Sequence, residues 1–273
     1  MPALFISHGA PTLALEPEGT CARALRRWAE ACPSPRALLV MSAHWEAPGP
    51  IRVTSAGRPP LIYDFAGFPD PLYALTYPAP GDPGLAAEVI RRLHDADLPA
   101  QEDPDRGWDH GVWIPLRLAF PEPRIPVVEI SLPRRSAPEE LMRIGRALSA
   151  LRSQGVLLIG SGGIVHNLRL IRLERKEAPA DSWALEFDEW VRTRLERHDF
   201  DALIRYREVA PHAALAVPTT EHFDPLFFVL GASGAEDDVV EIHDGIQYGN
   251  LSMRCFALQG RGATCDDSSS SPS

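Results

Sequence analysis

The sequence predicts an α/β fold: a single layered domain with a central mixed, mainly parallel β-sheet flanked by helices. Short apolar, β-branched runs alternate with longer amphipathic stretches, an order that places helices over a sheet. Near the C-terminus, strand-like runs follow each other with shorter connections, so part of the sheet is expected to be antiparallel. The 273 residues have ordinary globular composition, 45% hydrophobic and 23% charged, and no interior stretch resembles a linker.

The expected elements follow from these patterns. Buried strands are expected at residues 3–7, 37–42, 125–131 and 156–159, with further strand-like segments at 239–242 and 251–258. Helices are expected from Asp82 and Pro83, which can cap an apolar stripe, and from Pro138. A third helix is expected over residues 183–195, where large apolar side chains share one face. These stripes predict core packing.

Two regions lack this periodicity. Residues 47–80 hold many of the 27 prolines and several aromatic residues, namely Tyr63, Phe65, Phe68, Tyr73 and Tyr77. A long loop in a compact domain is often functional, and this one is expected to wall a pocket for a planar substrate. Residues 260–273 hold no core-forming run and are expected to be a disordered tail, so the folded catalytic domain is predicted to span residues 1–259.

Charge and hydropathy argue against two classes of partner. The formal net charge is −10, whereas a nucleic-acid surface needs clustered Lys and Arg. The most basic stretch, residues 168–176, interleaves Arg and Lys with leucines and is interpreted as a solvated helix or loop face. No apolar run approaches the ~18 residues that span a bilayer. We therefore expect neither a nucleic acid nor a membrane as partner.

The cysteines indicate a compartment. Cys21, Cys32, Cys255 and Cys265 form no CxxC pair, and the apolar run at the start is too short for a signal peptide. We therefore expect free thiols and a cytoplasmic protein.

Five of the nine histidines occupy positions typical of a site. His8 and His44 end the first two expected strands, and ligand sites of open α/β sheets lie beyond such carboxyl ends. His166 follows a glycine-rich turn after another strand, while His110 and His222 are flanked by turn or cap residues. Neutral imidazole is the commonest metal ligand, so these five predict a metal or acid–base site, although no compact signature such as HExxH is present.

The remaining four histidines are not expected to belong to a site. They lie on charged helical faces or in loops, and surface or structural positions are expected for His94, His198, His212 and His243. Ser–His–Asp hydrolysis is a competing chemistry, because Ser161 follows a strand. The G-x-S-x-G elbow is missing, however, since Ile159 stands two residues before it. The glycines beside Ser161 also lack the Lys-Ser/Thr of a phosphate loop, and are expected to let the backbone turn tightly beside a metal.

Several motifs resemble the 4,5-DOPA extradiol dioxygenase family, within the class III extradiol ring-cleaving dioxygenases. They occur in the same order from residue 2 to about residue 258 and lie around His8-Gly9, Ser42-Ala-His44-Trp45, residues 63–69 and 77–81, Trp108-Asp-His110-Gly111, Val165-His166-Asn167-Leu168 and Glu221-His222. The resemblance implies one catalytic α/β domain that uses O2 to open a small aromatic diol next to its two hydroxyls.

The resemblance also implies roles for the histidines. His8, His44 and His222 fall where the family holds its mononuclear non-haem metal, and His110 where it holds an acid–base histidine. His166 is either a fourth metal ligand or a second acid–base group. Many class III enzymes use two His and one Glu, whereas His222 takes that position here, with Glu221 beside it. An all-histidine site suits Zn(II) as well as Fe(II), the ion expected for activity.

Two alternative functions fit the same histidines. A zinc hydrolase could use the same site, with His166 or Glu221 as base. The other alternative is a non-catalytic metal-containing binding protein, because relatives of this fold exist that bind partners. Those relatives place a cysteine among the metal-site residues. No cysteine of this chain lies in a histidine motif, which argues against this alternative. No residue declares itself as a partner for the carboxylate or amine of DOPA, so the sequence leaves the particular catechol open.

Overall fold

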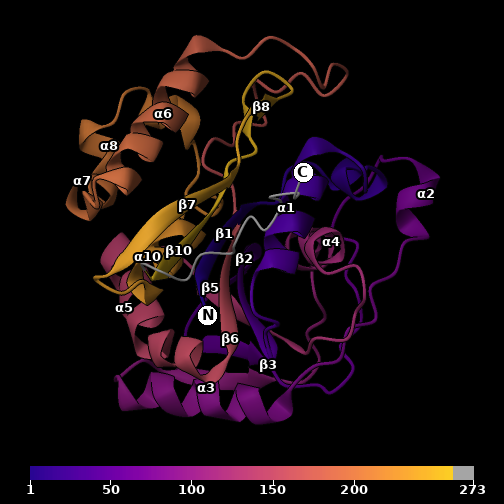
Figure 1. The fold of residues 1–273 in the computed structure, drawn as a ribbon, viewed down its shortest axis with the longest axis vertical. Coiled ribbons are helices and arrows are strands. Elements are labelled where there is room, and N and C mark those ends of the chain that lie inside the picture. The colour runs from indigo at the N-terminus through magenta and orange to yellow at the C-terminus, as the bar shows by residue number, and fades with distance from the viewer. Residues whose placement is uncertain (261–273) are drawn as a thin grey trace, which may run out of the picture.

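A computed structural model describes residues 1–260 and has one mixed β-sheet at its centre (Figure 1). The sheet has eight strands in the order β4-β3-β5-β2-β6-β1-β10-β7. Their bounds are β1 (Ala3–Ser7), β2 (Ala37–Ala47), β3 (Ile51–Thr54), β4 (Ala100–Asp103), β5 (Val127–Pro133), β6 (Val156–Gly162), β7 (Asp237–His243) and β10 (Cys255–Gly260). The central strands β5, β2, β6 and β1 run parallel, and β10 and β7 close one side antiparallel.

Helices cover both faces of this sheet. Alternate residues of each strand point to opposite faces, so Phe5 packs in one core cluster while Leu4 packs in the other. The Phe5 side is covered by α3 (Pro83–Asp95), α5 (Pro138–Leu148) and the wholly buried α10 (Pro225–Ala232). The Leu4 side is covered by α1 (Thr20–Ala31) and α4 (His110–Ala119). Two apolar layers therefore enclose the sheet, as the α/β class requires.

A group of helices on the β7 side of the sheet extends the first layer (Figure 1). They are α6 (Ser182–Glu196), α7 (Phe200–Ile204), α8 (Tyr206–Val209) and α9 (Ala213–Ala216). A buried ion pair joins α6 to the end of the chain, because Asp188 accepts from the Arg254 guanidinium at 2.6 and 3.0 Å and from Ser252 Oγ at 2.6 Å. The short elements are η1 (Pro11–Leu15), α2 (Asp70–Tyr73), η2 (Ser149–Gln154), β8 (Ile246–Gln247) and β9 (Leu251–Ser252).

The structure confirms the fold class and corrects several boundaries. Asp82 caps α3 as expected, accepting from the Leu85 backbone N–H at 2.9 Å. The expected loop at 47–80 contains β3 and α2, and the expected strand 251–258 is divided, because Leu251–Ser252 pairs with β8 in a separate two-stranded sheet. Gly260, the first residue of the expected tail, is the last residue of β10; the rest of that tail lies outside the described residues.

The second strand differs from the prediction in a way that shapes the site. His44 was expected to end this strand, but β2 continues to Ala47. The pairing with β6 stops at Ser42, and the pairing with β5 jumps from Met41↔Ile130 to Glu46↔Leu132. Five positions of β2 thus oppose two of β5, and the extra residues form a bulge. Bulges of this kind redirect side chains, and this one carries His44.

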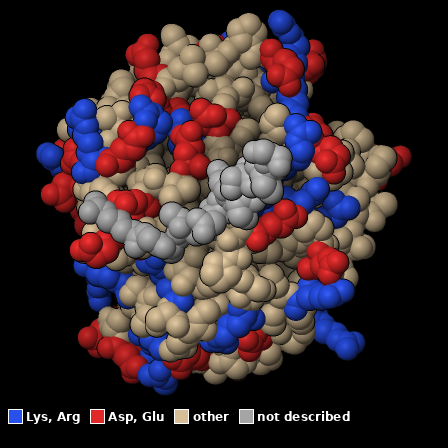
Figure 2. All heavy atoms as spheres, viewed as in Figure 1, with Lys and Arg blue, Asp and Glu red and all other residues tan. Residues whose placement is uncertain are grey.

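Charged side chains of both signs are mixed on one face of the molecule. Figure 2 shows acidic and basic side chains interspersed on the face in view, without a continuous basic patch. Among the helices of residues 1–260, none combines the length and apolarity that a membrane span requires.

Candidate metal centre

Two neighbouring strands and the segment that precedes α10 bring three histidines together. His8 follows β1, His44 lies in the bulge of β2, and His222 precedes α10, which packs against β6. One ligand nitrogen from each ring lies within 4.8 Å of the others. His8 and His222 are buried, and His44 is half-buried. The three residues expected to hold a metal therefore converge on one point at the edge of the sheet.

A serine fixes the orientation of His8. Ser161 Oγ donates a short hydrogen bond of 2.5 Å to the Gly111 carbonyl oxygen, so its lone pairs remain free to accept. His8 Nδ1 lies 3.0 Å from Ser161 Oγ, so Nδ1 must supply the proton of this hydrogen bond. This arrangement leaves Nε2 of His8 unprotonated, with its lone pair directed at His44 Nε2, 3.1 Å away. Ser161 thus positions a ligand, and it is not placed as a nucleophile.

Carboxylates orient the other two rings. Nδ1 of His44 lies 3.4 Å from Oδ2 of Asp64, and Nδ1 of His222 lies 3.2 Å from Oε1 of Glu221. Burial raises the pKa of Asp64, but its close contacts with the ring and backbone N–H of His110 outweigh this effect and lower it to about 2, so Asp64 is ionised. An ionised carboxylate needs a proton on the nitrogen that faces it. Nε2 of both His44 and His222 therefore carries a lone pair.

The three lone pairs lack a partner within the described protein. His222 Nε2 is buried and makes no hydrogen bond, and Nε2 of His8 and His44 face each other at 3.1 Å. Facing lone pairs repel unless a cation lies between them, and an unpartnered buried nitrogen is costly. The donor set thus fits a divalent metal that accepts neutral imidazole, which includes both iron and zinc.

The pKa values of these rings favour the form that binds metal. Burial lowers the pKa of His8 and of His222 well below the usual value for histidine, and neighbouring imidazoles lower both further. Burial, assisted by His110, lowers the pKa of His44 to about 4. All three rings are neutral at physiological pH, so a metal ion has few protons to displace.

His110 lies beside this group at the start of α4. Its ring centroid is 4.0 Å from that of His44 and 5.6 Å from that of His8. Asp64 Oδ1 accepts from the His110 backbone N–H at 2.9 Å, and ring Nδ1 lies 2.9 Å from the same oxygen, off the hydrogen-bonding direction. Asp64 thus bridges His44 and His110. Sequence reasoning gave Asp64 no role, although it is the only charged residue between Arg58 and Asp70.

His166 occupies a different position from the three converging rings. Its imidazole stacks face to face on that of His222, with centroids 3.5 Å apart and planes 6° apart. Its backbone N–H donates to the Ala216 carbonyl at 3.0 Å, and burial lowers its pKa to about 4. Its nitrogens do not belong to the group that shares the 4.8 Å separation.

A cavity of about 250 Å³ opens above the histidines. All five predicted site histidines and Asp64 line it, together with a larger set of apolar residues: Gly9, Ala10, Pro11, Phe65, Phe68, Leu168, Ile171, Leu173 and Leu251. Phe65 and Phe68 come from the aromatic segment that was expected to wall a pocket. The three residues from 168–173 come from the stretch interpreted as a solvated face, and two of these, Leu168 and Leu173, are exposed there. That interpretation missed their contribution to the cavity.

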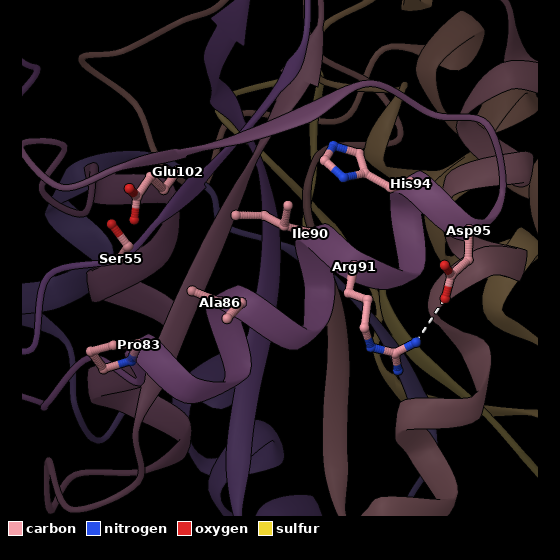
Figure 3. A pocket seen from close by; sticks show the side chains of 9 residues that line it. Ser55, Pro83, Ala86, Ile90, Arg91, His94, Asp95 and Glu102 are labelled. Carbon is pink, nitrogen blue, oxygen red and sulfur yellow. Dashed lines mark hydrogen bonds and ion pairs between the residues drawn. The ribbon is translucent and has the colours of Figure 1, made fainter.

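Another hollow, of about 540 Å³, lies beside α3 (Figure 3). Its polar groups have partners of their own: His94 Nε2 lies 2.8 Å from the Ala100 carbonyl oxygen, and Arg91 binds Asp95 at 2.7 Å. Although this hollow is larger than the histidine cavity, no group of converging histidines lines it, and we assign it no site. His198, His212 and His243 likewise do not line the histidine cavity, in agreement with their expected surface or structural roles.

The glycine-rich stretch 160–163 serves a different purpose from the predicted turn. Gly160 and Gly162 lie within β6, and only Gly163 follows it. A Cβ on Gly162 would lie 2.1 Å from the His222 carbonyl oxygen, and one on Gly160 would lie 2.3 Å from that of Pro225. The glycines therefore allow the His222 segment and α10 to approach the strand closely.

Comparison with known proteins agrees with this geometry. Residues 2–252 match the family described as the catalytic LigB subunit of aromatic ring-opening dioxygenase. The chain is 38% identical to the "4,5-DOPA dioxygenase extradiol" of Escherichia coli (strain K12) over 260 residues, 93% of each protein. It is 36% identical to the Beta vulgaris protein of the same name over 259 residues, 92% of this chain and 94% of that one.

A solved structure is similar across almost the whole chain. The crystal structure of an uncharacterized protein from Escherichia coli K12 superimposes with a TM-score of 0.78 at 32% identity, covering 95% of this chain and all of the other. The sheet, the histidine centre and these relatives lead to one assignment. The chain belongs to the LigB family of aromatic ring-opening dioxygenases and is an extradiol dioxygenase with a non-haem metal site, acting on an aromatic substrate and O2.

Proposed function

We propose that this protein opens the ring of a catechol beside its two hydroxyls, at one Fe(II) ion held by His8, His44 and His222. The observation that carries the proposal is the convergence of one ligand nitrogen from each of three rings, with a side-chain oxygen facing Nδ1 of each. Three ligands on one side of an ion leave other positions open for substrate. Two relatives named for 4,5-DOPA cleavage support a catechol, the ring that DOPA carries, as the substrate class.

The choice of iron follows from the reaction. The ferrous ion, when bound, supplies the redox chemistry with O2, which Zn(II) lacks because it has no accessible redox change. The imidazole donor set itself accepts either ion, so the protein can bind zinc without being active. Ferrous iron persists in a reducing cytosol, where we place the enzyme, and Cys21, Cys32 and Cys255 form no disulfide, which fits the same compartment.

The chain's other polar groups manage protons. A catechol must lose a proton as it binds, and a histidine within reach can accept it and return a proton later in the reaction. We assign these roles to His110 and His166, which line the cavity beside the metal ligands. Asp64 contacts both His44 and His110, and it thereby fixes the position of the acid–base ring of His110 relative to the metal ligand His44. Because His166 lies outside the converging trio, we propose it as an acid–base group and not as a fourth ligand.

Reconstitution with a defined metal tests this function. The protein, stripped of metal and loaded anaerobically with Fe(II), should consume O2 and yield a yellow ring-opened product from a catechol, whereas the zinc-loaded protein should not. His44→Ala should lose both metal and activity, while His198→Ala, an exposed histidine outside the cavity, should retain both. Hydrolysis of an ester by the zinc form, without O2 uptake by the iron form, would support a zinc hydrolase instead.

A further inference from the structure

The wall of the histidine cavity lacks a partner for a charged substituent. We propose that this enzyme prefers catechols whose ring carries an uncharged, apolar group, such as a short alkyl chain, over the zwitterionic amino acid DOPA. The inference rests on the proposed catechol cleavage at this site and names the substrate class within it. It is carried by the chemistry of the cavity wall, and it departs from the substrate in the relatives' names.

Apolar side chains form the wall beyond the metal end. Phe65 and Phe68 contribute one part of it, and Leu168, Ile171 and Leu173 contribute another. Leu168 and Leu173 are 61% and 56% exposed, although large aliphatic side chains are usually buried. Exposed apolar residues gathered at the rim of a cavity are typical of a site that is covered by an apolar ligand.

Backbone hydrogen bonds hold this leucine-bearing segment in place. The Arg172 backbone N–H donates to the Tyr248 carbonyl at 2.9 Å, and the Tyr248 N–H donates to the Lys176 carbonyl at 2.8 Å. At the other end, Asn167 Nδ2 donates to the Leu215 carbonyl at 2.8 Å. The rim is therefore a wall built into the fold at both of its ends.

Beyond the metal, a substrate carboxylate would meet no cationic side chain in the wall. Among residues 1–260, no lysine or arginine lines the cavity, and Asp64 contributes a carboxyl group of its own. On the rim segment, Arg172 binds Asp181 and Lys176 binds Glu16, while Arg169 and Arg175 are exposed and do not line the cavity. A charged group that loses water without gaining a partner weakens binding, so the carboxylate of DOPA should lower its affinity for this cavity.

An ammonium group also lacks a free partner in the cavity. Among the described residues, Asp64 is the only carboxylate in the wall, and its two oxygens face the rings of His44 and His110. The remaining polar groups of the wall are imidazoles, which the two ring hydroxyls of a catechol require. Neither charge of a zwitterion therefore has a free partner in the cavity.

A substrate series separates these contributions. Steady-state rates of the Fe(II)-loaded protein would be measured with 4-ethylcatechol, 3,4-dihydroxyphenylpropionate and DOPA, which share the diol and differ in substituent charge. We expect kcat/KM for 4-ethylcatechol to exceed that for DOPA by about 10- to 100-fold, mostly through KM, because one unpaired charged group commonly has an effect of this size. Equal values, or faster turnover of DOPA, would overturn the inference while leaving catechol cleavage intact.

A rim substitution with a matched control tests the wall directly. Leu173→Arg places a cation at the cavity and should raise the kcat/KM ratio of dihydroxyphenylpropionate to ethylcatechol by about 10-fold. Leu170→Arg adds the same charge on the same segment, at an exposed position that does not line the cavity, and should leave the ratio unchanged. The same change in both variants would show that long-range charge sets the ratio and would contradict a role for the wall.

A binding measurement distinguishes the two proposals. Anaerobic calorimetric titration of the zinc-loaded protein reports the affinity for each catechol without turnover. Tighter binding of ethylcatechol than of DOPA, in a protein whose iron form cleaves neither, would support this inference and refute the proposed function. DOPA binding as tightly as ethylcatechol would overturn the inference whatever the activity, and binding of neither would overturn both.

Discussion

At the scale of single residues, the site depends on which nitrogen of each imidazole carries the proton. Oxygens of Ser161, Asp64 and Glu221 each face an Nδ1, and this contact favours the proton there and leaves the Nε2 lone pairs of His8, His44 and His222 directed at one region. Acceptors of this kind typically change metal affinity by about 10- to 100-fold when they are removed. These three side chains are therefore as much a part of the metal centre as the ligands.

His110 provides a test of the division between ligand and acid–base residue. His110→Gln should keep the metal content of the wild-type protein, because the trio of ligands is intact. Turnover of a catechol should fall by about 10²- to 10⁴-fold, the usual loss when a general acid or base is removed. Metal content by mass spectrometry and rates by O2 uptake would be measured together. An empty metal site in this variant would place His110 among the ligands.

Glu129 is a buried acid beneath the site that the proposed reaction does not use. It lies on β5, is fully buried, and neither carboxyl oxygen has a hydrogen-bond partner in the described structure. Burial, together with the neighbouring Asp109 carboxylate, raises its pKa well above the usual value for glutamate. In the folded protein Glu129 therefore holds a proton at pH values where the unfolded chain has lost it.

The sign of this linkage can be measured. The folded state binds the extra proton, so the contribution of Glu129 to stability is lost as pH rises above the unfolded pKa, by up to about 1.4 kcal/mol per pH unit. Glu129→Gln cannot ionise and should gain stability over the wild type between pH 5 and pH 8. Urea unfolding of both proteins at each pH measures the gain, with exposed Glu139→Gln as control. A difference that stays constant with pH would refute a protonated Glu129.

At the scale of elements, close approach between β6 and the His222 segment sets the depth of the metal site. The Gly163 N–H donates to the His222 carbonyl at 2.7 Å, and a Cβ on Gly162 would lie 2.1 Å from that oxygen. This approach needs glycine in a strand, where glycine is otherwise unfavourable. The bulge of β2 acts in the same way for His44, because it turns the ring toward His8.

Gly162→Ala tests the importance of this approach. The added methyl group must push the His222 segment outward, and displacement of a ligand by about 1 Å commonly lowers activity about 10²-fold. We expect weaker metal binding in a chelator competition, with unchanged circular dichroism in the far ultraviolet. Gly57→Ala is a suitable control, since a Cβ there meets no atom within 4 Å. Wild-type metal affinity in Gly162→Ala would contradict the argument.

At the scale of the whole molecule, metal-free protein should be sensitive to acid. Burial lowers the pKa of four histidines, two of them (His44 and His166) to about 4, so the folded state binds fewer protons than the unfolded chain below pH 6.5. Stability supplied by these neutral rings is present above pH 6.5 and is lost as pH falls toward 4. We expect these four rings to take up about four protons when the metal-free protein unfolds near pH 5, offset in part by the protons that Glu129 and Asp224 release.

Unfolding free energies from urea titrations between pH 5 and pH 7.5 measure this proton uptake. Bound metal should raise the transition midpoint at neutral pH, because an ion that binds only the folded state stabilises it by mass action. A metal-free protein whose stability is flat over this range would contradict the neutral, buried histidine cluster.

The sequence alone determined the fold class and predicted the five site histidines. Strand and helix periodicities are local, and apolar runs of fixed spacing pack in few ways, so the layered α/β sheet followed directly. His8, His44, His110, His166 and His222 could be selected because each lies beside an expected strand end or turn, although β2 runs past His44. Helices α1, α4 and α10 were not predicted. In α10 every residue is buried and no amphipathic stripe exists to reveal it.

Only the tertiary structure decided what surrounds those histidines. Asp64, Ser161 and Glu221 act on rings that are 20, 153 and one position away along the chain, and no local spacing signals the first two contacts. The same holds for Leu168 and Leu173, which look like solvated leucines until the fold places them beside Phe65 and Phe68. Proton positions and cavity walls depend on contacts between distant segments, and such contacts exist only once the chain has folded.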